Sequence, residues 1–341
     1  MWSPQRSTIG ILILLLFGMV VWGRSTDAQQ AQSESRWLVF ARSRVQFGIH
    51  SGRVVFTMLL PRGFVSPWST DQLGGKEQIA IVHSSETGAS EFTYRQLSPK
   101  RKLTITAKAN GRLAIRQEPG DRGKTVPSEF LQEPSQPLVL TFGKDAEKKT
   151  LTAPTLWHLL LEHPDPCKQY VLPDLERLRP DWKLLDQAQA VEKALLAAAR
   201  LGKLPDRQHW AALVAQLADE RFTRREAADR QLRAIGRQVL PYLRDLDREK
   251  LDVEQQYRIH RIVESLSDTL TDETPRQTAN SMLGDPTIWI VLLGRDSQST
   301  REVAAKYLER LLESPIDFDP AADAPTRRRQ IEALRKRIAG Q

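Results

Sequence analysis

Hydrophobic and polar positions follow one period before residue 150 and another after it. Between residues 36 and 150, apolar residues alternate with polar ones in short runs that glycine-containing turns separate. Alternation with period two places one face of a β-strand in a core and the other in solvent. The pattern predicts an antiparallel β-sandwich or barrel-like domain over 36–150. The alternating apolar positions are Val45, Phe47 and Ile49; Phe92 and Tyr94; Leu103, Ile105 and Ala107; Leu138, Leu140 and Phe142.

From residue 151 onward, the apolar residues recur at helical spacing in runs that short turns join. Prolines stand mostly at the starts of these runs, where the first turn of a helix accepts them. This pattern predicts an all-α region, divided into a helical connector at 151–205 and a repeat domain at 206–341. The whole chain is therefore expected to have an α+β fold in which the β-rich domain comes first.

The helical region contains a self-similar segment. Shifting residues 210–235 by 76 positions places them on residues 286–311 without a gap. That separation equals two units of about 38 residues, and helix pairs of roughly 40 residues are the period of HEAT-type α-solenoids. The repeat therefore predicts a short solenoid of stacked helix pairs. The identical pairs are Leu217–Leu293, Arg225–Arg301, Glu226–Glu302, Ala228–Ala304 and Leu232–Leu308.

Residues 219–245 resemble the HEAT-like repeat module of exported bacterial proteins. The module's pattern runs acidic, aromatic, Arg-Glu, Ala, Leu, Gly and then apolar-Pro-apolar. Residues 300–338 are similar to the element that ends such arrays, but its usual preceding Gly and later Trp are missing. The resemblance implies a scaffold that binds a partner and implies no activity. The matching positions are Phe222, Arg225, Glu226, Ala228, Leu232, Gly236 and Pro241, with Arg301 and Glu302 in the second stretch.

Elementary helix chemistry gives several of these residues structural roles. Thr223 is expected to be the N-cap of the first helix of the module, with Glu226 completing a capping box. Gly236 provides a sharp turn at the end of that helix, and Pro241 lies in the first turn of the next one. We interpret Arg225 and Glu226 as stabilising the module and not as binding a ligand.

In the β-rich part, the clearest local signal is a hairpin at 102–116. Asn110 and Gly111 both tolerate positive φ and separate two alternating runs, so a two-residue type I′ turn is expected. With the apolar positions in the core, the opposite face carries a basic stripe. It is either an anionic-ligand site or the solvent side of an edge hairpin, where cations discourage edge-to-edge pairing. The stripe consists of Lys102, Lys108, Arg112 and Arg116.

The first residues have the features of an export signal. Arg6 precedes an unbroken apolar run at residues 9–22. This run is shorter than the roughly 20 residues that cross a bilayer as a helix. Residues 1–28 are expected to be a signal peptide cleaved after Ala28, or else an uncleaved anchor, and 29–35 a linker. Either outcome places the folded part in the periplasm or outside the cell.

Charge is distributed unevenly between the two halves. Residues 29–150 hold 18 Lys and Arg against 11 Asp and Glu, whereas residues 151–341 hold 30 of each kind. The basic excess could attract an anionic envelope polymer, a membrane surface or an acidic protein over a long range, or serve solubility alone. Overall, 40% hydrophobic and 27% charged residues indicate a folded, soluble protein.

No motif for catalysis, a cofactor or a metal stands out. Cys167 is the only cysteine, so an intramolecular disulfide and Cys-x-x-Cys chemistry are excluded. His158 and His163 lie five residues apart on one expected helix and point in different directions, so they cannot chelate one ion. A nucleophile elbow and a phosphate-binding loop are missing too. We therefore expect a protein that is not an enzyme and has no cofactor.

These observations rank three functions. The first is a non-catalytic exported scaffold that binds a protein of the cell envelope through its helical repeats. The second assigns binding to the basic β-rich domain, which would recognise an anionic glycan or lipid with the helices as a spacer. The third is a hydrolytic enzyme with a dispersed site, which would require histidine and carboxylates converging in a wide pocket at the domain junction. Export argues against a nucleic-acid partner, and the oligomeric state is left open.

Overall fold

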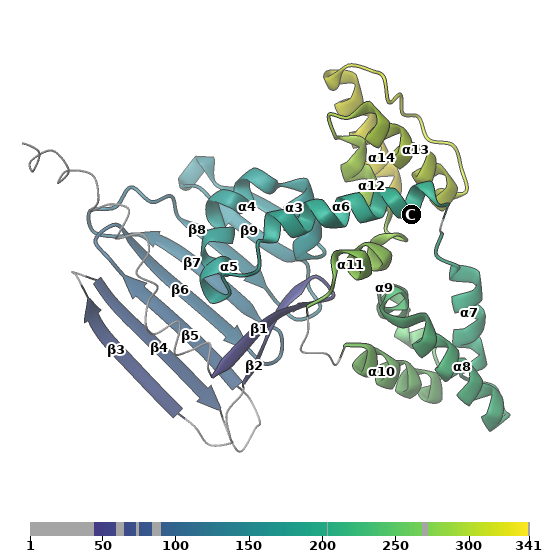
Figure 1. The fold of residues 1–341 in the computed structure, drawn as a ribbon, viewed down its shortest axis with the longest axis horizontal. Helices are drawn as coiled ribbons and strands as arrows, with labels where there is room; N and C mark the ends of the chain where they lie inside the picture. The colour runs from purple at the N-terminus through teal and green to yellow at the C-terminus, as the bar shows by residue number, and fades with distance from the viewer. Residues whose placement is uncertain are drawn as a thin grey trace, which may run out of the picture.

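The computed structural model describes residues 44–58, 65–72, 75–83, 90–202, 204–267 and 272–339. The expected signal peptide at 1–28 and linker at 29–35 lie outside these residues. An antiparallel β region comes first and helices follow it, which confirms the predicted α+β layout (Figure 1). Within the described part of the chain, no helix is both long and apolar enough to cross a membrane.

A meander of eight antiparallel strands forms the main sheet of the described residues, with β3 to β10 side by side in sequence order. Successive residues alternate between buried and partly exposed positions, as period two predicts, and Leu103, Ile105, Leu113 and Ile115 are almost completely buried. The strands are β3 (Val65–Gln72), β4 (Gly75–His83), β5 (Ser90–Leu97), β6 (Arg101–Lys108), β7 (Leu113–Pro119), β8 (Ser128–Gln132), β9 (Leu138–Phe142) and β10 (Lys149–Ala153).

A separate hairpin, β1 (Val45–His50) and β2 (Arg53–Met58), adds a second β layer. Gln132 of β8 connects the layers, because its side-chain amide accepts from the Val54 N–H at 3.0 Å and donates to the Val54 carbonyl at 2.7 Å. One glutamine thus replaces a strand partner at the edge of β2. Phe47 of β1 packs edge-on against Phe92 of β5, which places the hairpin on the hydrophobic core.

The turn predicted at Asn110 and Gly111 differs from the type I′ turn that the sequence indicated. Between β6 and β7 the connection is a three-residue loop, in which Gly111 N–H donates to the Lys108 carbonyl at 3.0 Å. Gly111 has a φ of +90°, but Asn110 is not among the residues with positive φ, so the type I′ prediction is wrong. The Asn110 side chain instead accepts from the Arg112 N–H at 3.0 Å. Both central residues of the β1–β2 turn, Ser51 and Gly52, have positive φ, as type I′ requires.

Four helices pack on the β region and belong to its hydrophobic core. They are α3 (Leu156–Glu162), α4 (Pro164–Tyr170), α5 (Leu172–Leu178) and α6 (Leu184–Arg200). Tyr170 of α4 stacks on Phe142 of β9 with ring centroids 4.6 Å apart. The same core continues into α11 (Pro275–Met282), α12 (Pro286–Leu293), α13 (Gln298–Leu312) and α14 (Ala324–Ala339). We call everything that shares this larger core the body.

The segment between α6 and α11 folds separately into what we call the helical arm, residues 207–267. It consists of α7 (Arg207–Gln216), α8 (Phe222–Ile235), the 3-10 helix η2 (Gly236–Val239), α9 (Leu240–Asp245), a short 3-10 helix η3 (Arg248–Lys250) and α10 (Val253–Ser267). Its buried residues form a second hydrophobic cluster, distinct from that of the body among the described residues. In Figure 1, α7, α8 and α10 lie well away from the sheet.

The 76-residue shift found in the sequence also relates elements of the structure. It brings α8 onto α13, which begin at Phe222 and Gln298, and α7 close to α12. Three identical pairs fill the same interior positions: Leu217 and Leu293, Ala228 and Ala304, and Leu232 and Leu308 all have 0% exposure. The arm and the C-terminal part of the body therefore contain equivalent helix pairs.

The predicted N-cap at Thr223 is wrong. Helix α8 begins one residue earlier, at Phe222, and its N-cap residue Arg221 makes no side-chain capping hydrogen bond. In α13 the equivalent residue is Ser297, whose hydroxyl accepts from the Thr300 N–H. An arginine offers no acceptor at that position. The arm therefore lacks a side-chain cap that its counterpart in the body possesses.

Candidate functional site

The basic stripe on the main sheet is matched by carboxylates. Each of its four cations lies within ion-pair distance of an Asp or Glu on a neighbouring strand or loop. Exposed pairs of this kind contribute little stability, but they cancel charge locally. The stripe therefore presents alternating signs to solvent. The pairs are Lys102 with Asp121 at 3.4 Å, Lys108 with Glu91 at 3.5 Å, Arg112 with Glu133 at 2.8 Å and Arg116 with Glu129 at 2.6 Å.

This pairing leads to a prediction for anion binding. We expect Lys102→Glu, Lys108→Glu and Arg112→Glu, combined in one chain, to shorten retention on a heparin column. The shortening should be no greater than that caused by three charge reversals elsewhere in the β region, because only net charge changes in both cases. Lys144, Lys148 and Lys149 provide the matched control, since all three are exposed. A selective loss of retention in the stripe variant would instead favour an anionic-ligand site.

The repeat-signature arginines act as clamps on the backbone. Arg225 Nη1 donates to the carbonyls of Asp219 at 2.8 Å and Glu220 at 3.1 Å. Arg301 Nη1 makes the same two bonds 76 residues later, to the carbonyls of Arg295 at 2.8 Å and Asp296 at 2.7 Å. In each case the arginine satisfies carbonyls that follow the preceding helix and so fixes the turn between two helices.

The remaining signature residues also have structural positions. Glu226 accepts from Arg258 at 2.8 Å and so joins α8 to α10, whereas Glu302 accepts from Gln298 within α13. Gly236 ends α8, and Pro241 stands in the first turn of α9. Together with the buried Ala228 and Leu232, these residues hold the module together.

A hydroxyl, an imidazole and a carboxylate form a chain at the start of α3. Thr155 Oγ1 lies 2.8 Å from His158 Nδ1, and His158 Nε2 lies 2.9 Å from Asp285 Oδ2. Burial raises the pKa of Asp285, but the interactions with His158 and the hydrogen bonds from Thr287 together outweigh burial, so the pKa is lowered. A hydroxyl, an imidazole and a carboxylate bonded in this order are the groups that form an activated nucleophile in some enzymes.

The turn of the β1–β2 hairpin covers one side of the Thr155 hydroxyl. Thr155 is the N-cap of α3, and the next backbone N–H, that of Leu156, donates to the Gly52 carbonyl at 2.8 Å. A Cβ added to Gly52 would lie 2.8 Å from Thr155 Oγ1, so the turn of the β1–β2 hairpin rests directly on it. His158 thus joins the starts of α3 and α12, because Asp285 is the N-cap of α12.

A buried carboxylate ties α5 to the sheet. Asp174 is completely buried, accepts from the Gln117 side chain at 2.5 Å and lies 3.4 Å from the Arg101 guanidinium. Burial raises the pKa of Asp174, and both Arg101 and Arg177 oppose that effect. Because Arg101 comes from β6 and Arg177 from α5, the cluster fixes the helix on the sheet.

Acidic groups and a histidine converge where the hairpin, the arm and α11 meet. Asp272 accepts from the Ile49 N–H at 2.9 Å and pairs with Arg179 at 2.6 Å. Glu273 accepts from the Ser51 N–H at 2.9 Å and lies 3.4 Å from Arg237 of the arm. Burial raises the pKa of Glu273. We call this cluster, together with His50, the junction.

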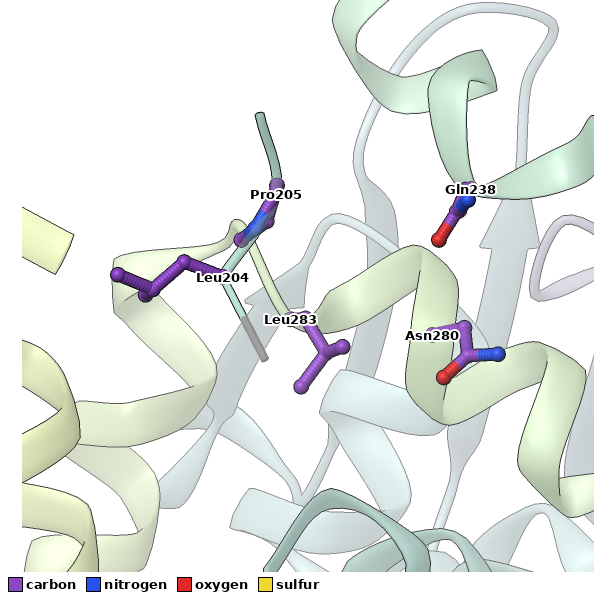
Figure 2. Close-up of a pocket in the computed structure, with 5 residues that line it drawn as sticks. All are labelled: Leu204, Pro205, Gln238, Asn280 and Leu283. Carbon is purple, nitrogen blue, oxygen red and sulfur yellow. The ribbon is translucent and has the colours of Figure 1, made fainter. Parts of the chain in front are cut away.

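The two best-formed hollows in the described residues do not expose this cluster. One, of about 310 Å³, is lined by Leu204, Pro205, Gln238, Asn280 and Leu283, none of which ionises (Figure 2). The other, of about 360 Å³, lies between β1 and the end of α5, and Arg179 on its wall already pairs with Asp272. The described residues also hold no group of three or more His, Cys, Asp or Glu placed to bind a metal.

Three large apolar side chains of α8 and α10 in the arm are exposed, and we call them together the aromatic face. It consists of Phe222, Val253 and Tyr257, which are 59%, 83% and 56% exposed. The guanidinium groups of Arg225 and Arg258 lie 5.7 and 6.0 Å from the centre of the Phe222 ring. Arg261 lies 5.9 Å from that of Tyr257.

The repeat signature in the sequence includes Phe222 but gives no indication of Val253 or Tyr257. A signal was present, because Val253 and Tyr257 are four residues apart and share one side of α10. The inward side of the same helix carries Ile259 and Ile262, which are buried. The core of the arm needs apolar residues on only one side of α10, so the apolar residues on its other side indicate a surface that could contact another molecule.

Comparison with known proteins found no matching family model, curated protein or solved structure.

Proposed function

We propose that this chain is a non-catalytic, exported interaction protein that binds a protein partner of the cell envelope through its helical arm. The observation that carries the proposal is the aromatic face on a separately folded arm. Tyrosine and arginine are enriched among the residues that dominate binding energy at protein interfaces. Exposed aromatic rings with guanidinium groups beside them offer a large contact area at a low cost in side-chain entropy.

Two further observations support the proposal. The arm and the α12–α13 pair repeat the same helix pair with the same arginine clamp, which is how HEAT-type arrays build a scaffold. The equivalent of Phe222 under the 76-residue shift is Gln298, which is exposed but neither aromatic nor basic. Tyr257 lies beyond the residues that the shift aligns; Ala333 of α14, 76 residues after it, is exposed and serves as a control position. The aromatic face is therefore a property of the arm and not of the repeat.

Photo-crosslinking in the native cell envelope tests this function. A photoreactive amino acid at position 257 of the full chain should form one discrete adduct with an envelope protein. The same amino acid at positions 298 and 333 is the matched control and should not form that adduct. Adducts of equal intensity at all three positions, or none at position 257, would refute the proposal.

A substitution gives the quantitative prediction. Phe222→Ser with the photoreactive group at 257, and Tyr257→Ser with it at 222, should each weaken capture of the same protein about tenfold or more, because a central aromatic anchor contributes about 2 kcal/mol or more. Both side chains are more than half exposed, so folding should be unaffected. Circular dichroism identical to that of the unaltered chain provides the control.

A further inference from the structure

Polar contacts cross the seam between the arm and the body. Across it, Arg207 donates to the Gly284 carbonyl at 2.8 Å, and Arg237 of η2 lies 3.4 Å from Glu273. Figure 2 shows the cavity beside the seam, where Gln238 of the arm lies across from Asn280 of α11. An unfilled cavity forfeits packing contacts on the surfaces that line it. The charged groups at the junction therefore contribute to holding the arm in position.

His50 lies at this seam, at the end of β1. Its Nδ1 atom is buried and has no hydrogen-bond partner within the described residues. The ring lies beside Asp272, since a Cβ built on Gly48 would be 3.4 Å from both His50 Nε2 and Asp272 Oδ1. A proton on Nδ1 would therefore be a donor with no hydrogen-bond acceptor placed for it among the described residues.

The charged groups around His50 come from every element that meets at the junction. From the arm, Arg237 belongs to η2 and Arg244 to α9, and both face Glu273. From the body, Arg179 follows α5, and Arg53 begins β2 and is within electrostatic reach of Arg244. The two carboxylates, Asp272 and Glu273, precede α11. Among the described residues, these arginines outnumber the two carboxylates before His50 is charged.

Both carboxylates already have partners. Asp272 uses one oxygen for the Ile49 N–H and the other for Arg179. Glu273 uses one oxygen, Oε1, for both the Ser51 N–H and Arg237, whereas its other oxygen, Oε2, is buried and has no hydrogen-bond partner within the described residues. A proton on His50 would thus add a cation that faces Arg237, with Asp272 as the one opposing charge acting on it among the described residues.

We propose that the junction is an acid-sensitive joint, in which proton uptake by His50 loosens the contact between the hairpin and the arm and lets the arm change its orientation. This goes beyond the binding function, because it concerns how the arm is held and not what the arm binds. An acidic compartment would then alter the presentation of the aromatic face.

The sign of the effect follows from the two titrating groups. Burial and then Arg237 lower the pKa of His50 below its ordinary value of 6.5, and Asp272 opposes them. A lowered pKa means that the docked state is favoured above pH 6.5 and loses this advantage as the pH falls. Burial raises the pKa of Glu273 above 4.5, so its proton uptake favours the docked state in more acidic solution. The joint should therefore loosen first below pH 6.5, and Glu273 should oppose this at lower pH.

Distance measurements on the full chain test the proposal. Spin labels at Arg230→Cys in α8 and Lys149→Cys in β10 would report the position of the arm, since both residues are exposed. Cys167 would not react, because it is completely buried and burial raises its pKa to about 12. At pH 7.5 the distance distribution should be narrow, and at pH 5.5 a displaced population should appear. The ratio of the two should change by up to about tenfold for each unit by which docking lowers the pKa of His50.

Variants distinguish the effect of a proton on His50 from general effects of acid. His50→Gln is neutral at both pH values and should keep the narrow distribution at pH 5.5, and His50→Asn repeats the test should the first variant misfold. His260→Gln is the matched control, because His260 is an exposed histidine of the arm, and it should respond as the unaltered chain does. An unchanged distribution in the unaltered chain, or the same acid response in both His50 variants, would overturn the proposal. Neither result depends on a binding partner.

Discussion

Replacing Arg301 by methionine should lower the free energy of unfolding by about 2–4 kcal/mol, one of the two largest effects expected in this chain. The side chain is 5% exposed and donates to three carbonyls, those of Arg295, Asp296 and Pro320. A hydrogen bond from a charged donor contributes about 1.5–3 kcal/mol, and a buried carbonyl left without a partner costs about 1–3 kcal/mol. Methionine retains apolar volume, so the loss is mainly that of the hydrogen bonds.

The duplicated clamp provides an internal comparison. Arg225→Met removes bonds to two carbonyls from a side chain that is 24% exposed, so water can replace part of what is lost. We expect a cost of about 1 kcal/mol there. Arg328→Met, at an exposed position of α14, should change stability by less than about 0.5 kcal/mol. Urea unfolding of all three variants makes the measurement, and equal costs for Arg225→Met and Arg301→Met would contradict this account.

The sequence predicted the secondary-structure classes and the repeat because both depend on local spacing. Leu217, Ala228 and Leu232 are buried at positions that their partners 76 residues later also occupy. The pattern could not reveal that the two helix pairs belong to different cores. That division depends on α11, which returns to pack on α6 and separates the arm from the α12–α13 pair.

The pairing of residues between strands could not be predicted from the sequence. The basic stripe looked unbalanced because Glu91 and Glu129 are distant from it along the chain. The register places Glu91 opposite Lys108 and Glu129 opposite Arg116. A single sequence does not state register, so it could not show that the stripe is paired.

The cluster of residues at the junction could not be predicted from the sequence either. His50, Arg237 and Glu273 come from three distant segments, and none stands in a motif. What brings them together is a feature of the fold: the outer edge of β1 would expose backbone groups, and residues 272 and 273 satisfy two of its N–H groups through side chains. The covering of a strand edge thus placed two carboxylates next to a histidine and an arginine of the arm.

The second large effect is expected at the turn of the β1–β2 hairpin. Gly52 has a φ of +67°, and a Cβ at this position would lie 2.6 Å from Thr155 Cβ. Gly52→Ala therefore combines a left-handed backbone, which costs about 1–2 kcal/mol for a residue with a side chain, with overpacking that costs about 1–3 kcal/mol. We expect the free energy of unfolding to fall by about 2–5 kcal/mol.

Gly111→Ala isolates the first of these two contributions. Gly111 also has a positive φ, of +90°, but nothing lies within 4 Å of the Cβ that the substitution would add. Its cost should be about 1–2 kcal/mol, from backbone conformation alone. The difference between the two variants in urea unfolding then measures how tightly the hairpin turn rests on the start of α3. If Gly52→Ala cost no more than Gly111→Ala, the turn would not be pressed against Thr155.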